Sequence, residues 1–138
     1  RLSGPLLDRI DIRIEVPAVK AADLILPAPA EPSSVVAERV AAARAIQRAR
    51  YAALGSPVTC NAQCAPSLIE KVAEPDQPAM ALLRQAAEAM RLSARGYHRI
   101  LKVARTLADL DGADRVGRIH LAEALSYRAV GDILAAAA

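Results

Sequence analysis

The sequence predicts an all-α protein, a small helical bundle preceded by one detached strand and a linker. Apolar residues make up 54% of the 138 residues, yet the chain has no Phe or Trp and only three Tyr. A core of aliphatic and small side chains is typical of helix-on-helix packing, because small residues let helices approach closely. From residue 34 onward the apolar residues recur at spacings of three and four, the period of a helix. The length fits one domain.

Residues 1–33 follow a different pattern. In "RIDIRIEV", residues 9–16, Ile and Val alternate with charged residues, which is the pattern of a half-buried strand. One strand cannot form a sheet alone, and no second strand follows, so we expect its partners to lie outside this chain. "PAPAEPSS" then reads as an extended linker. We expect residues 1–33 to be mobile or only adventitiously packed.

Residues 34–131 are expected to form the helical domain, and each helix carries a start or stop signal. A long helix ends at Gly55, and a short one has Pro66 in its first turn. Asp76 and Ser93 are predicted caps of the next two helices. The last helix follows the turn "DGADRVG", and residues 132–138 form an Ala-rich tail that we expect to fray.

The helix of residues 93–110 is strongly amphipathic. Its predicted buried stripe consists of Tyr97, Ile100, Leu101, Ala104, Leu107 and Ala108. Arg95 falls in its first turn, where unpaired N–H groups and the helix dipole give a partial positive charge. An Arg there is unfavourable by a few tenths of a kcal/mol. The residues alone leave two readings open: Arg95 is exposed with little effect, or it helps the helix end to hold an anion such as phosphate.

The other chemistry-bearing residues give weaker signals. The net charge of +3 allows an anionic partner but does not require one. The spacing of Cys60 and Cys64 does not predict a metal site, because zinc needs about four ligands and the two histidines lie in separate helices. We expect two reduced thiols. No apolar run reaches the length of a membrane span and no signal peptide is seen, so we expect a soluble, cytoplasmic protein.

Two motifs taken as an ordered pair carry a family resemblance. "LSGPLLDRIDIRIEV" near the start and "LSARGYHRILKVARTLADLDGADRVGRIHLAEALSYR" near the end resemble the magnesium-chelatase-like AAA+ ATPases of the ComM-type competence family. The likeness runs from residue 1 to about residue 128 and is least in the linker and in "CNAQC". It implies a carboxy-terminal piece of such an ATPase, in which the end of the αβα core, residues 1–33, precedes the helical lid, residues 34–131.

The resemblance also implies roles for two residues. Arg9 matches the arginine finger, donated in trans to the nucleotide of a neighbouring subunit, and Arg95 matches the sensor-2 arginine. A guanidinium suits both roles, because its fixed fork of donors fits phosphate oxygens and keeps its charge. The parent protein is then expected to be an ATPase that uses ATP and Mg²⁺. Its expected partners are its own upstream core, the neighbouring subunits of a homo-oligomeric ring (a hexamer) and DNA.

The chain itself contains no GxxxxGK[ST] phosphate loop and no acidic strand end for Mg²⁺. We therefore expect this fragment to be inactive alone and to bind no cofactor. Two alternatives remain. One is a motor for magnesium insertion into a porphyrin. The other is a DNA-binding helical module whose basic residues would be Arg39, Arg44, Arg48, Arg99, Lys102 and Arg105. The opposing interpretation places Arg99, Lys102 and Arg105 on a solvated helix face.

Overall fold

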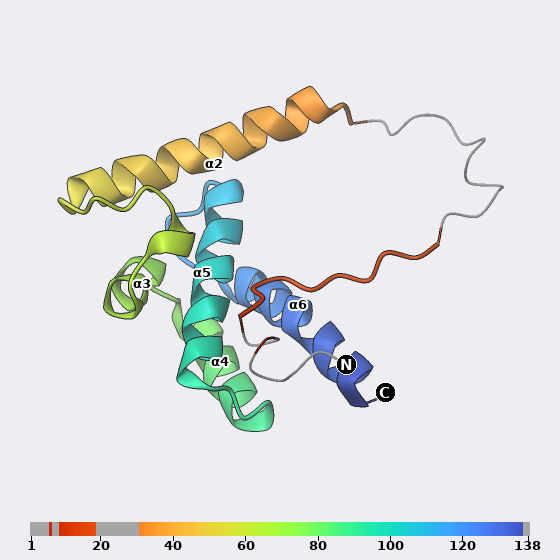
Figure 1. Cartoon of the computed structure of the whole chain (residues 1–138). Coiled ribbons are helices and arrows are strands. Elements are labelled where there is room, and N and C mark those ends of the chain that lie inside the picture. The colour runs from red at the N-terminus through yellow and green to blue at the C-terminus, as the bar shows by residue number, and fades with distance from the viewer. Residues whose placement is uncertain (1–5, 7–8, 19–30, 137–138) are drawn as a thin grey trace.

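The computed structural model describes residues 6, 9–18 and 31–136, and this part of the chain is a helical bundle (Figure 1). Its five α-helices and one 3₁₀ helix are α2 (Ser33–Ala53), η2 (Asn61–Gln63), α3 (Pro66–Ala73), α4 (Gln77–Ala89), α5 (Ala94–Leu110) and α6 (Arg118–Ala136). The all-α prediction is confirmed. Helix α6 continues to Ala136, past residue 131, where we expected the helical domain to end.

Helix α5 is the centre of the bundle (Figure 1), in contact with α2, η2, α3 and α6, while α4 packs on α6. The predicted stripe of α5 faces this core. Ile100, Leu101, Ala104 and Ala108 are buried, with at most 1% of each residue exposed, and Tyr97 is half-buried against them. The helical period of the sequence therefore identified the packing face of this helix correctly.

The helix ends have the structures that their residues favour. Ser93 Oγ accepts a hydrogen bond from the Gly96 amide at 3.1 Å, and Asp76 Oδ1 accepts one from the Ala79 amide at 2.8 Å. Each bond satisfies an amide that the helix leaves unpaired at its first turn. Both predicted caps are confirmed. After α5, Gly112 has φ of +66°, a left-handed conformation that glycine adopts without steric cost.

Only the second half of α2 is buried in the bundle. Ala43, Gln47 and Tyr51 are each less than 5% exposed. Val36 and Val40, two turns and one turn earlier on the same side of the helix, are 40% and 50% exposed. These two valines line a hollow that α2 forms with α6 and the end of α5. Helix α2 is thus anchored at its carboxy-terminal end.

Residues 9–18 form no strand, which differs from the period-two pattern of the sequence. Their apolar residues point outward: Ile10, Ile12, Ile14 and Val16 are 36%, 52%, 66% and 78% exposed. Asp11 and Arg13 are half-buried, and the Arg13 amide donates to the Tyr127 carbonyl oxygen at 3.1 Å. Because a strand needs a partner for its backbone groups, these residues bond to the bundle instead. Of the predicted linker, residues 27–34, the first four lie outside the described residues, while Ser33 and Ser34 already belong to α2.

Candidate functional site

Arg95, the predicted sensor-2 residue, is exposed in the first turn of α5. It shares one face of this helix with three other basic side chains, since spacings of three and four residues place them one above another. The four line a hollow of about 420 Å³ with Pro66 and Ala94: they are Arg95, His98, Arg99 and Lys102. A concave surface with this charge is suited to an anion.

Three of the four basic side chains already bond within the chain. The partners are Glu70 for His98 (2.8 Å from Nε2), the Ala62 carbonyl oxygen for Lys102 (2.9 Å from Nζ) and Asp11 for Arg99. Arg95 makes no hydrogen bond or ion pair with any residue that the structure describes. Its guanidinium therefore has its donors open to a ligand from outside the described chain.

Arg9, the predicted arginine finger, lies in an exposed turn. Its backbone carbonyl oxygen accepts a hydrogen bond from Arg99 Nη1 at 2.7 Å, and the same guanidinium pairs with the Asp11 carboxylate. Arg99 follows Arg95 by one turn of α5. The structure therefore brings the backbone of Arg9 to the helix face that carries Arg95, across about 90 positions of sequence. Sequence reasoning did not foresee this contact, because its residues lie in different motifs.

The glycine of "LSARG" lies against a buried arginine of α6. Arg128, from the "LSYR" end of the second motif, is 7% exposed and lies against the first turn of α5. A Cβ atom at Gly96 would lie only 3.2 Å from Arg128 Nη2. The two ends of the motif thus meet in space, directly behind the turn that carries Arg95.

A buried ionic network at the other end of α5 was missed by the sequence analysis. The Asp109 carboxylate accepts hydrogen bonds from Arg105 Nε at 3.0 Å, Asn61 Nδ2 at 2.9 Å and Arg50 Nη1 at 3.1 Å. Arg105 is 1% exposed and also donates to the carbonyl oxygens of two residues in the turn that follows, Ala113 (2.5 Å) and Asp114 (2.7 Å). The interpretation of Arg105 as a solvated or DNA-contacting residue is therefore wrong.

The pKa directions follow from this geometry. The hydrogen bond to Asp109 raises the pKa of Arg50, while burial lowers the pKa of Arg105 from its ordinary value. An arginine keeps its charge despite such shifts, because its ordinary pKa lies far above neutral pH. The network therefore joins α2, η2 and α5 through charged groups, and its role is to hold the bundle together.

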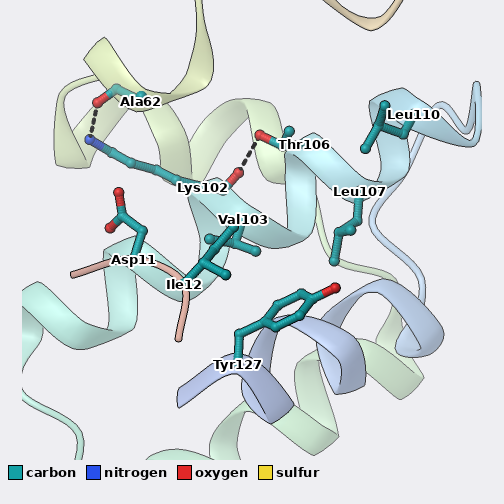
Figure 2. Close-up of a pocket in the computed structure, with 9 residues that line it drawn as sticks. All are labelled: Asp11, Ile12, Ala62, Lys102, Val103, Thr106, Leu107, Leu110 and Tyr127. Atoms are coloured by element: carbon teal, nitrogen blue, oxygen red, sulfur yellow. Dashed lines mark hydrogen bonds between the residues drawn. The ribbon is translucent and has the colours of Figure 1, made fainter. Parts of the chain in front are cut away.

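A second hollow, of about 350 Å³, lies between α5 and α6 beside residues 11 and 12 (Figure 2). Figure 2 shows Tyr127 of α6 below Val103 and Leu107 of α5, with Ile12 next to Val103. Most of the lining is apolar, and Lys102 is turned away toward the Ala62 carbonyl oxygen. The hollow therefore suits an apolar side chain.

The described residues contain neither a metal-binding cluster nor a membrane-spanning helix. Among the residues that the structure describes, no group of three or more His, Cys, Asp or Glu side chains could hold a metal ion. Both cysteines, Cys60 and Cys64, are buried free thiols. No helix in the described ranges has the length and apolar character that crossing a membrane would need.

Comparison with known proteins points to one family. The family model described as "Magnesium chelatase, subunit ChlI C-terminal" matches residues 30–128. The chain is 41% identical to Competence protein ComM of Haemophilus influenzae, over 97% of this chain and 25% of that protein. It is 38% identical to the uncharacterized protein YifB of Escherichia coli, over 97% of this chain and 26% of that protein. The chain thus spans about a quarter of the length of the curated relatives it matches.

Proposed function

The chain belongs to the family of the carboxy-terminal domain of magnesium chelatase subunit ChlI, and we propose that it is the lid of an AAA+ ATPase whose Arg95 senses bound nucleotide. In this role Arg95 contacts the phosphates of ATP held with Mg²⁺ by the upstream core of the same subunit. The chain has no phosphate loop of its own. The chain supplies the positively charged Arg95 side chain, and the upstream core binds the nucleotide.

The observation that carries this proposal is the setting of Arg95. It is an exposed cation at the positive end of a helix, in a hollow lined by three more basic side chains. Arg95 has no acidic partner among the described residues, and the partial positive charge of the helix start repels its guanidinium. A phosphate removes the repulsion, because it accepts bonds from the guanidinium fork and from the helix end together. The site is therefore better suited to a bound phosphate than to being empty.

Arg9 is proposed to act on a different nucleotide. Its segment leaves the side chain exposed, and a guanidinium donated from a neighbouring subunit stabilises charge on the phosphoryl group during hydrolysis. This role requires a homo-oligomeric ring, for which we propose a hexamer. The name of the ComM relative refers to competence, the uptake of DNA by cells, so we further propose that the ring acts on DNA in uptake or recombination.

The test uses the full-length parent protein. Arg95→Ala is expected to lower ATP turnover by about 10-fold or more, and Arg9→Ala by about 10³-fold. The matched control is Arg84→Ala, which removes an exposed arginine from α4 and is expected to leave turnover unchanged. Arg95→Ala should change the free energy of unfolding by less than about 0.5 kcal/mol, since the side chain is exposed. If Arg95→Ala hydrolyses ATP at the wild-type rate, the sensor role is wrong.

Mixing the two inactive variants separates the cis role from the trans role. A site between an Arg9→Ala subunit that binds ATP and an Arg95→Ala neighbour has both arginines intact. Random mixing of equal amounts therefore restores about a quarter of the sites in a closed ring. Failure to recover any turnover from an assembled mixture would contradict the assignment of the two arginines to opposite sides of one interface.

The alternative of a DNA-binding helical module is less well supported. Of its six basic residues, Arg105 is buried and three others bond within the chain: Arg39 to Glu31 at 2.7 Å, Arg99 to Asp11, and Lys102 to a backbone carbonyl. Arg44 and Arg48 remain exposed on α2. If the chain is such a module, it should bind DNA on its own. Its affinity for DNA should fall steeply with salt concentration and should not depend on ATP.

A further inference from the structure

The contact between residues 9–13 and the bundle is built from polar groups. Arg99 of α5 holds two points of the segment, the Asp11 carboxylate and the Arg9 carbonyl oxygen at 2.7 Å. The Arg13 amide holds a third point, on the Tyr127 carbonyl oxygen of α6, at 3.1 Å. Residues 9, 11 and 13 thus attach the segment to α5 and α6. These alternate residues share the side of the segment that faces the bundle.

The apolar residues of the same segment contribute less to this attachment. Ile10, Ile12 and Ile14 are 36%, 52% and 66% exposed, although Ile12 touches the hollow of Figure 2. With the apolar side turned outward, the ion pair between Arg99 and Asp11 is a specific side-chain contact that holds the segment. The pair is partly exposed, with 26% of the Arg99 side chain and 43% of the Asp11 side chain accessible. Ion pairs of this kind are weak enough to form and break readily.

We propose that Arg99 is a positioning residue that uses Asp11 to hold the segment bearing Arg9 on the helix bearing Arg95. The proposal rests on the proposed function, in which Arg95 reads the nucleotide of its own subunit and Arg9 completes the site of the next. Because one guanidinium ties the two together, a movement of α5 on nucleotide binding is transmitted to Arg9. Neighbouring nucleotide sites in the ring are then coupled, because the segment of residues 9–13 is either attached to α5 or released from it.

The physical contact is tested first in the 138-residue chain, by hydrogen exchange of the Arg13 amide. Asp11→Asn and Arg99→Gln are each expected to speed this exchange about 3- to 5-fold, since each removes the ion pair. The control is Glu15→Gln, an exposed acid four residues along the same segment, with no expected change. The charge swap of Asp11→Arg with Arg99→Asp should restore slow exchange. Unchanged exchange in both single variants would overturn the proposal.

The functional readout is the steepness of ATP turnover against ATP concentration in the full-length protein. Asp11→Asn is expected to lower the Hill coefficient toward 1 while leaving the Kd for ATP unchanged. Arg99→Gln should lower the Hill coefficient as well, and the charge swap should restore cooperativity. Weaker ATP binding in Arg99→Gln alone would mean that Arg99 touches nucleotide, which refutes a positioning role. Normal ATP turnover in Arg95→Ala would refute the proposed function. Faster exchange of the Arg13 amide in Asp11→Asn and Arg99→Gln would still establish the ion pair. Normal steepness in Asp11→Asn, with Arg95→Ala inactive, refutes the coupling alone.

Discussion

Replacing Asp109 by Ala tests whether the charged network at the end of α5 holds the bundle together. The Asp109 side chain is 0% exposed and Arg105 is 1% exposed, whereas Arg50 is 20% exposed. Without the carboxylate, Arg105 is left as a buried charge without its ionic partner, which costs roughly 3–5 kcal/mol. Arg105 keeps its bonds to the Ala113 and Asp114 carbonyl oxygens. We therefore expect a loss near the lower limit, about 3 kcal/mol.

Urea unfolding followed by far-UV circular dichroism measures this loss. A domain has only about 5–15 kcal/mol of stability in total, so Asp109→Ala should lower the midpoint by about 2 M urea. Glu31→Gln is the matched control: it breaks an ion pair with Arg39 whose side chains are 44% and 57% exposed, and should cost less than about 0.5 kcal/mol. Asp109→Asn keeps the shape and is expected to cost about 2 kcal/mol, which covers the case in which the Ala variant does not fold. Losses below about 1 kcal/mol in both Asp109 variants would refute the reasoning.

Two further predictions concern the ends of α5. Ser93→Ala should destabilise the chain by about 1 kcal/mol, because the Gly96 amide loses its acceptor; Ser93→Asp keeps a cap, so equal melting temperatures for the two variants would argue against a capping role. Gly112→Ala should cost about 1 kcal/mol in urea unfolding, because φ of +66° strains a residue with a Cβ atom even where no atom lies within 4 Å of it. Gly112→Asn should cost less, since Asn tolerates this conformation, and an equal cost would point to a different cause.

The features that local sequence decides were predicted well. The stripe of α5 follows from apolar residues on one helix face, and the caps at Asp76 and Ser93 involve an amide three residues away. Both depend on neighbours within one or two turns. The same is true of the exposure of Arg95, which follows from its place off the stripe. These local preferences are kept in the folded structure because the tertiary contacts favour the same arrangement.

The features that depend on distant residues were not predictable. Arg105 and Asp109 stand four positions apart, which is also the spacing of an ordinary exposed helix pair. Asp109 also bonds with two distant residues, Arg50, 59 positions away, and Asn61, 48 positions away. The alternation of residues 9–16 is a genuine strand pattern, but a strand also needs a partner. Nothing in the local pattern reveals that its polar side would bond to α5.

The position of the buried network has a mechanical consequence for Arg95. The network fixes α5 at Asp109, while Arg95 stands about 14 residues away, or about 21 Å along the helix axis. If the whole domain tilts about the network at Asp109, α5 acts as a rigid lever with the Arg95 guanidinium near its tip. A tilt of about 5° at the pivot swings the tip by about 2 Å, enough to make or break a hydrogen bond. In the proposed nucleotide-sensing role of Arg95, a slight rotation of the domain would therefore make or break a phosphate contact.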